Sequence, residues 1–297
     1  MLANKLWIGL ALAAAPGALL AGCMSDDGNA TDDGADSADS GSAEHALTGT
    51  QDKGAGTWFW SWGRDTNLPT ATNTITINPT SQASCFLSGI GGDLISVEGA
   101  EEPSGTLYTY GDAGVAIDGG NYTLTAFAGE PGVTLEAQAM CTSDTAGRSA
   151  QYTYFSAYDS SATRMVADDG HHACFLQELY DNEEYYDSGT FASSTDEISI
   201  FSTGGYFYLG GTGDVAASAQ CIEINSFRGE WNWTNGTLNL ATNDENPGTQ
   251  CFLTGFLGSL RDSDNYTDGA FINYNSGLLQ YSLTVSSGKR AWAECID

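Results

Sequence analysis

A motif that occurs three times constrains this sequence more than any other feature. Each copy of Cys-Phe-Leu is followed 44 to 56 residues later by a second cysteine, which closes an alternating, strand-like segment. Chance rarely supplies such paired spacing three times, so we expect three related units that bury a shared core or stack as copies. The cysteine pairs of the units are Cys85 and Cys141, Cys174 and Cys221, and Cys251 and Cys295.

Other landmarks recur in the same frame. An alternating aromatic segment precedes each Cys-Phe-Leu motif, and a segment with an aromatic residue two positions before a leucine precedes each closing cysteine. Both recurrences place the unit boundaries at the same points. The expected units are residues 54–141, 142–221 and 222–297.

The local pattern within each unit is typical of β-strands. Apolar residues alternate with polar ones in segments such as Thr74–Asn78 and Glu197–Ile200, and pairs such as Asn235-Gly236 mark turns. No segment has a long apolar period of 3.6 residues. We therefore predict an all-β fold of three pseudo-repeated, disulfide-bonded β units, with five or six strands each, which together form one compact domain.

The repeats leave the sheet arrangement open. Three sheets around a pseudo-threefold axis, three sandwich-like modules in tandem and an enlarged trefoil all fit, although units near 80 residues are long for a trefoil. Six cysteines allow 15 connectivities, of which two respect the repeat. We favour pairing within units, because each unit can then oxidise without its neighbour. Pairing across unit boundaries, which joins Cys141 to Cys174, Cys221 to Cys251 and Cys295 to Cys85, is the alternative; metal ligation is disfavoured because the cysteines are widely spaced.

The N-terminus has the features of an export signal. Lys5 precedes an apolar run from Leu6 to Leu20, which is short for a membrane span. The run ends in Leu-Ala-Gly before Cys23, and this resembles the bacterial lipobox. The resemblance implies that residues 1–22 are a lipoprotein signal peptide and that Cys23 carries the acyl chains. Two or more chains would anchor the protein stably, at roughly 0.8 kcal/mol per buried methylene.

The next segment differs sharply from the rest. Residues 23–53 are rich in Asp, Gly, Ser and Ala, contain no aromatic residue, and cannot bury enough apolar surface to fold. We interpret them as an acidic, disordered tether. The whole chain has 9 basic and 38 acidic residues and a formal net charge of −29. This charge excludes nucleic acid as a partner and allows divalent-cation binding.

The repeated units resemble those of secreted proteins and lipoproteins of myxobacterial type, in which Cys-Phe-Leu-(Ser/Thr)-Gly opens a unit and a cysteine strand closes it. The resemblance covers about residues 56 to 296. It implies no catalytic residue, because the family has no assigned activity. Unit two departs from the pattern at Gln177-Glu178, where the small residue and the glycine are missing.

Few residues suggest chemistry. His171 and His172 are adjacent and would point to opposite faces of a strand, which disfavours joint chelation. The acidic loop with Asp262, Asp264 and Asp268 could present oxygens to calcium, the one cofactor that we consider. Paired carboxylates could serve a glycoside hydrolase, but 38 acidic residues make any pair uninformative.

The aromatic residues are the better candidates for ligand contact. Alternation places Trp58, Trp60 and Trp62 on one strand face, and Trp231 and Trp233 recur in unit three. Such rows can stack on sugar rings, and they can equally form a buried β face. Tyr185 and Tyr186 are additional contact candidates.

The expected function is non-enzymatic. We predict an envelope lipoprotein, placed at the outer membrane because Met24 rather than Asp follows Cys23, that presents a rigid β domain to a polysaccharide or an envelope protein. A carbohydrate-active hydrolase that uses an Asp/Glu pair and a structural, calcium-dependent envelope component are the alternatives.

Overall fold

The computed structural model describes most of the repeated region. The chain divides into two compact units, residues 1–40 and 41–297, and every described residue belongs to the second. Among the described residues there is no apolar helix of membrane-spanning length. The described residues are 50–52, 57–65, 74–94, 100–101, 107–108, 111–127, 134–143, 145–159, 161–181, 189–242, 249–261, 265, 267–275 and 277–297.

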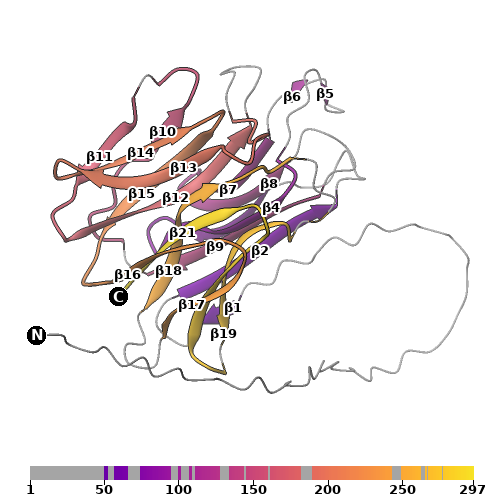
Figure 1. The fold of residues 1–297 in the computed structure, drawn as a ribbon. Coiled ribbons are helices and arrows are strands. Elements are labelled where there is room, and N and C mark those ends of the chain that lie inside the picture. Colours follow the sequence, from indigo (N-terminus) through magenta and orange to yellow (C-terminus); the bar gives the residue numbers. More distant parts are fainter. Residues whose placement is uncertain are drawn as a thin grey trace, which may run out of the picture. The chain divides into compact units, whose positions relative to one another are not determined.

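Every element of secondary structure in these residues is a strand or a turn, so the predicted all-β class is confirmed (Figure 1). Within the described part of the chain, each unit contributes six strands to the three large sheets. Unit one supplies β2 (Thr57–Asp65), β3 (Thr74–Pro79), β4 (Ser84–Gly92), β7 (Gly111–Asp118), β8 (Asn121–Phe127) and β9 (Thr134–Thr142). Unit two supplies β10 (Tyr152–Phe155), β11 (Thr163–Ala167), β12 (His172–Asp181), β13 (Glu197–Thr203), β14 (Tyr206–Thr212) and β15 (Ala216–Glu223). Unit three supplies β16 (Phe227–Trp233), β17 (Gly236–Thr242), β18 (Gln250–Leu257), β19 (Gly269–Asn275), β20 (Gln280–Val285) and β21 (Arg290–Ile296).

The units exchange strands around a ring. Sheet 1 has the order β1-β2-β9-β4-β19-β20-β17, in which β1 is Thr50–Asp52; sheet 2 is β10-β15-β12-β7-β8-β3, and sheet 3 is β11-β14-β13-β18-β21-β16. Each sheet thus combines three strands of one unit with three of another, and unit three returns to pair with unit one. Sheet 1 has β1 as a seventh strand, which comes from the end of the segment predicted to be a tether. Three independent tandem modules are ruled out, and the pseudo-threefold arrangement is the observed one. A separate hairpin joins β5 (Ala100–Glu101) and β6 (Leu107–Tyr108).

The Cys-Phe-Leu strands β4, β12 and β18 form the centre. Both faces of these strands are buried, which explains their nearly continuous apolar sequence. Their phenylalanines Phe86, Phe175 and Phe252 meet one another, with ring centroids 4.6 to 5.0 Å apart. The repeated Phe therefore supplies the contact point of the three units.

A β-bulge follows each motif at the same position. The register of the Cys-Phe-Leu strand against its closing strand shifts at Ser88, Gln177 and Thr254. Such a bulge re-aims the residues that follow it. Unit two keeps this bulge although Gln177-Glu178 replaces the small residue and glycine, so the different sequence does not change the position of the register shift.

At the position after the bulge, a glycine on one strand faces a large residue on the neighbouring strand, and units one and two differ in which strand has the glycine. A Cβ on Gly89 would lie 2.5 Å from the Phe271 ring. In unit two the roles reverse: Glu178 is buried opposite Gly114, where a Cβ would meet the Gln177 carbonyl at 2.1 Å. Burial raises the pKa of Glu178, whose carboxyl accepts hydrogen bonds from neutral side chains. The donors to Glu178 are Tyr180, Ser218 and Gln151.

Three disulfides close the units. They join Cys85 to Cys141, Cys174 to Cys221, and Cys251 to Cys295, so the within-unit pairing is the observed one. Each links directly opposite residues of neighbouring strands. In the chain-entropy model, loops of 44 to 56 residues are each worth about 4 kcal/mol.

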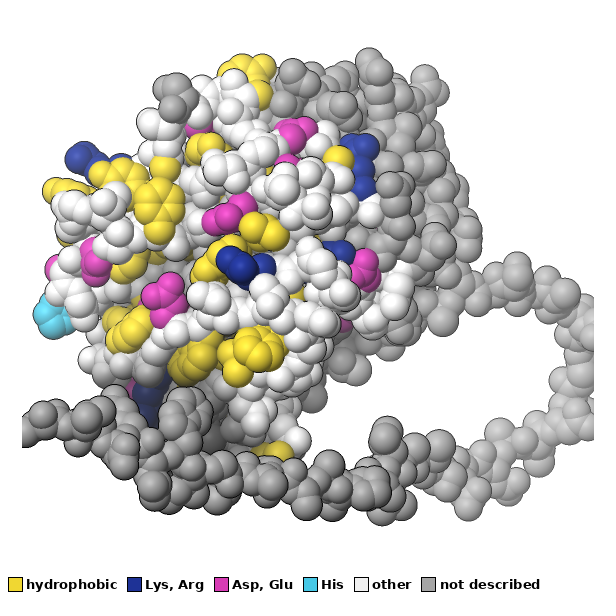
Figure 2. Space-filling model, viewed as in Figure 1, with side chains coloured by type: hydrophobic (Ala, Val, Ile, Leu, Met, Phe, Trp, Pro, Cys, Tyr) yellow, Lys and Arg dark blue, Asp and Glu magenta, His cyan; other side chains and the backbone are white. Residues whose placement is uncertain are grey.

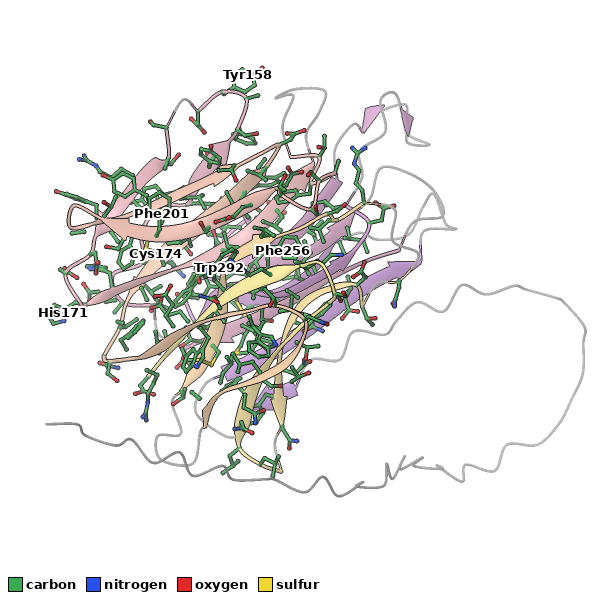
Figure 3. The ribbon with its side chains drawn as sticks, in the orientation of Figure 1. Tyr158, His171, Cys174, Phe201, Phe256 and Trp292 are labelled. Atoms are coloured by element: carbon green, nitrogen blue, oxygen red, sulfur yellow. A yellow bond between two sulfur atoms is a disulfide. The ribbon has the colours of Figure 1, made fainter. Side chains whose placement is uncertain are left out.

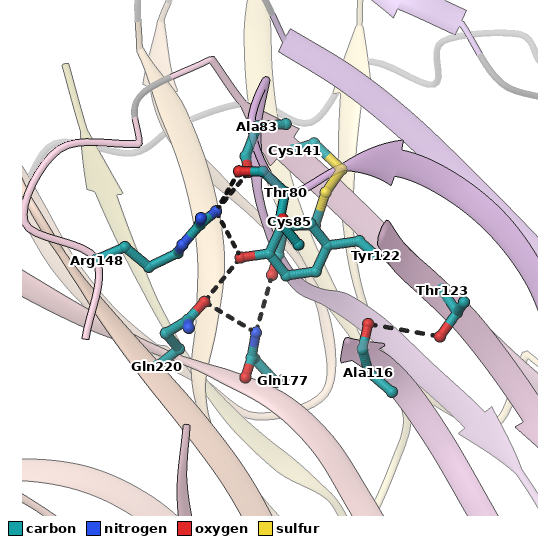
Figure 4. Close-up of a disulfide and its surroundings, with 10 residues drawn as sticks. All are labelled: Thr80, Ala83, Cys85, Ala116, Tyr122, Thr123, Cys141, Arg148, Gln177 and Gln220. Carbon is teal, nitrogen blue, oxygen red and sulfur yellow. Dashed lines mark hydrogen bonds between the residues drawn. A yellow bond between two sulfur atoms is a disulfide. The ribbon is translucent and has the colours of Figure 1, made fainter. Parts of the chain in front are cut away.

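A polar network fastens unit one to unit two beside the first disulfide (Figure 4). The Arg148 guanidinium donates to the carbonyls of Thr80 and Ala83 at 2.7 and 2.9 Å. The buried Tyr122 hydroxyl donates to Gln220 at 2.8 Å. Burial raises the pKa of Tyr122, and the Arg148 charge opposes this rise. These contacts make Arg148 structural and leave it unsuited to ligand binding.

Candidate functional site

The outer face of sheet 3 carries exposed aromatic side chains. In β13, Ile198 points into the core, so by alternation Phe201 points outward; it is 42% exposed. In β14, Leu209 is buried, whereas Tyr206 on the opposite face is 39% exposed. Figure 3 labels Phe201 on β13 and Trp292 on β21, another strand of the same sheet.

Three aromatic side chains and one arginine on this face lie next to one another. Phe201 and Tyr208 are directly opposite on β13 and β14, and their rings stack at 5.8 Å with an interplanar angle of 15°. Arg164 is opposite Tyr208 on β11, and its guanidinium carbon lies 4.8 Å from the centre of the Tyr206 ring. We call Arg164, Phe201, Tyr206 and Tyr208 the aromatic platform. Stacked rings and a guanidinium plane give a flat surface with polar edges.

The other two sheets show that the fold does not require this platform. The strand registers align the three sheets residue by residue, because Ser199, Phe271 and Gly114 each pair with the residue after the bulge. At the four platform positions, the other sheets have small or uncharged polar residues. Phe201 corresponds to Asn273 and Ala116, Tyr208 to Ser282 and Thr123, Tyr206 to Gln280 and Asn121, and Arg164 to Asn239 and Thr76.

The half of this face that unit three contributes also differs from the other sheets. Trp292 on β21 covers Gly255, where a Cβ would lie 2.9 Å from the indole, and Arg290 lies over the indole at 5.8 Å. The corresponding residues to Trp292 are Gln138 and Ser218. In Figure 2, drawn in the same view as Figure 3, hydrophobic side chains are exposed beside basic and acidic ones.

A buried carboxyl lies next to Trp292 on this face. Glu294 is 9% exposed, pairs in register with Glu230 on β16, and accepts no hydrogen bond from any residue that the structure describes. Burial, with smaller contributions from the charges of Glu230 and Asp168, raises the pKa of Glu294 to about 8. At neutral pH a carboxyl with this pKa is mostly protonated and can donate a hydrogen bond.

The tryptophans that the sequence singled out in unit three belong to the core. Trp231 and Trp233 are opposite the buried Ala293 and Ala291, and they pack against the core with part of each side chain exposed. The register puts Trp60 and Trp62 opposite Ala139 and Ala137, the matching positions of unit one. The side chains of Trp58, Trp60 and Trp62 lie outside the described residues.

The histidine pair forms a local contact. His172 Nδ1 lies 3.0 Å from Asp169 Oδ1, which also accepts the backbone N–H of His171, and these hydrogen bonds lower the pKa of Asp169. His171 lies at the edge of the molecule in Figure 3. Among the described residues, no three His, Cys, Asp or Glu side chains are arranged to hold a metal ion.

The structure describes one of the three aspartates of the proposed calcium loop. Asp268 accepts a hydrogen bond from the buried Lys289 ammonium at 2.9 Å and so forms an ion pair. Asp262 and Asp264 lie outside the described residues, as do Tyr185, Tyr186 and Cys23.

The sequence contains a signal for the platform that the pattern of a single strand does not reveal. In β14, aromatic residues occur in both phases of the alternation: Phe207 points inward, and Tyr206 and Tyr208 point outward. Only strand-by-strand alignment of the three units reveals that unit two alone has aromatic residues at the positions of Phe201, Tyr206 and Tyr208. Comparisons with protein-family models, curated proteins and solved structures give no match for this chain.

Proposed function

We propose that this protein is a lipid-anchored binding module of the cell envelope that holds a polysaccharide on the aromatic platform of sheet 3. The observation that carries the proposal is the set of Phe201, Tyr206 and Tyr208 on one face: Phe201 and Tyr206 are exposed, and Phe201 stacks on the half-buried Tyr208. The other two sheets have small or uncharged polar residues at these positions. Flat aromatic surfaces accept the apolar faces of sugar rings with little loss of side-chain entropy, because a tyrosine has only two rotatable angles.

The scaffold suits presentation of a preformed surface. Every sheet contains strands of two units, and each unit is closed by a disulfide, so the platform rests on strands that are fixed at several points. A rigid site loses little conformational freedom on binding. The disulfides also agree with an oxidising compartment outside the cytoplasm, and the signal peptide and Cys23 support anchorage there.

The test compares matched substitutions on two sheets. The full mature chain with Cys23→Ser would be purified oxidised and assayed by titration calorimetry against a panel of soluble polysaccharides. Phe201→Ala and Tyr206→Ala should each weaken binding about tenfold, which corresponds to about 1.4 kcal/mol. Asn273→Ala and Gln280→Ala, at the corresponding positions of sheet 1, should leave binding unchanged. Equal effects of the two pairs, or no binding at all, would refute the proposal.

The buried carboxyl supports a second candidate function. A glycoside hydrolase needs one protonated and one ionised carboxyl beside the substrate. Glu294 supplies the raised pKa, and Glu230 and Asp168 supply carboxylates nearby. Release of reducing ends from a bound polysaccharide, abolished in Glu294→Gln while binding persists, would establish this activity. A bound polysaccharide that stays intact over days would exclude it for that substrate.

A further inference from the structure

The basic residues of this chain are few, and most of those described are used inside the fold. The structure describes the side chains of six: four of them bond to protein oxygens and two do not. Arg148 binds backbone carbonyls, Arg228 pairs with Asp297, Arg261 donates to the Thr190 carbonyl, and Lys289 pairs with Asp268. Arg164 and Arg290 make no hydrogen bond or ion pair with any residue that the structure describes.

Both remaining arginines lie on the outer face of sheet 3. Each is exposed and lies over an aromatic ring, Arg164 over Tyr206 and Arg290 over Trp292. The fold does not need them there, because Arg164 corresponds to Asn239 and Thr76 in the other sheets, and Arg290 to Glu136 and Ala216. A chain that has nine basic residues in 297 therefore keeps two of them as uncommitted donors beside exposed rings.

The outer face of sheet 3 also has carboxyl side chains, whose charge is opposite to that of the two arginines. Glu230 and Asp168 are exposed carboxylates, and both act on Glu294 through their charges. A polyanion would meet these carboxylates and the negative charge of the whole chain. A polycation would meet the two guanidinium groups. Hydroxyl groups both donate and accept hydrogen bonds, so a ligand rich in hydroxyls and without charge satisfies both kinds of side chain.

We infer that the ligand of this face is a neutral polysaccharide. This inference rests on the proposed function and narrows its ligand. Sugar rings pack against Phe201, Tyr206 and Trp292, beside the two arginines. Sugar hydroxyls accept from Arg164 and Arg290 and donate to Asp168 and Glu230, which leaves no charge of the ligand to be neutralised.

The experiment uses charge-matched ligands and charge-conserving variants. The mature chain would be titrated with neutral glucans, mannans and galactans, with uronate-containing and sulfated polymers, and with amino-sugar polymers, at 50 and 500 mM NaCl. A neutral polymer should bind best, and its affinity should change less than about twofold between the two salt concentrations, because no ion pair is screened. Arg164→Lys should weaken binding at least as much as Arg164→Gln, since lysine keeps the charge and loses the planar set of donors. Asn239→Ala, at the matching position of sheet 1, is the control.

The outcomes separate the two proposals. Preferred binding of an acidic polymer, with steep salt dependence and an intact Arg164→Lys variant, would overturn the neutral ligand and leave the platform as a polysaccharide site. Preferred binding of an amino-sugar polymer that Glu230→Gln weakens would do the same. If no polysaccharide of any charge binds, or if Phe201→Ala and Tyr206→Ala bind as the unmodified chain does, both proposals fall.

Discussion

Replacement of Glu294 by glutamine should make the protein more stable at alkaline pH and leave it unchanged at acidic pH. The folded chain holds the Glu294 proton up to a pKa of about 8, whereas the unfolded chain releases it near the ordinary value of 4.5. Between these values the unfolded state binds fewer protons, so the free energy of unfolding falls as the pH rises. Above pH 8 the carboxyl is ionised in both states, so the full free-energy cost of burying its charge lowers the stability of the folded chain.

The magnitude follows from the pKa difference. A difference of about 3.5 units corresponds to at most roughly 5 kcal/mol, since each unit is worth 1.36 kcal/mol. Urea unfolding of the oxidised chain and of Glu294→Gln, at pH 4.5 and pH 9, measures the effect by subtraction, which removes the contributions of other groups that titrate. The variant should gain a few kcal/mol at pH 9 and nothing at pH 4.5. If Glu294→Gln and the unmodified chain were equally stable at both pH values, Glu294 would be solvated in the folded protein and the reasoning would be refuted.

Three further changes test the fold by urea unfolding at neutral pH. Gly114→Ala should destabilise by more than about 3 kcal/mol, because its Cβ would meet backbone atoms 2.1 to 2.6 Å away, whereas Gly119→Ala, with open space around it, should lose only about 1 kcal/mol to backbone strain; equal losses would contradict the close packing. Phe252→Ala removes one ring of the central contact and should destabilise by about 3 to 5 kcal/mol, and a loss below 1 kcal/mol would show that the rings are not packed. Removal of the third disulfide by Cys251→Ser with Cys295→Ser should lower stability by about 4 kcal/mol, with an unchanged Gly114→Ala effect as a sign that the rest of the fold persists.

Much of the fold could be predicted from the sequence because the repeats are local signals. The spacing of the cysteines favours the within-unit pairs that the structure shows, and alternation predicts five or six strands in each unit. The exchange of strands between units could not be predicted, since β4 shows no preference in its sequence for β19 of unit three over β7 of its own unit. Partner choice depends on packing around the axis at Phe86, Phe175 and Phe252, which involves residues far apart in the chain.

The candidate site was harder to predict than the fold. Alternation correctly put Trp231 and Trp233 on one face and left open which face it was; their position opposite Ala293 and Ala291 identifies it as the core face. The platform residue Phe201 escaped notice because it follows two inward isoleucines and resembles an extension of a buried strand. The exposure of Phe201 depends on which face of β13 it occupies. The strand register determines that face, and a run of apolar residues in the sequence does not.

The ring of exchanged strands has a consequence for how such a protein can be built. A single unit forms two three-stranded sheets, and one edge strand of each pairs with a strand of another unit, so a unit alone would leave both of these edges unpaired. Three separate copies of one unit could fill those edges for one another in the same cyclic order. The chain has therefore the connectivity of a trimer whose subunits are joined end to end. Which unit comes first is a matter of where the links are placed, and a permuted chain that starts at Tyr152 and ends at Thr142 would preserve the pairings within and between all three units.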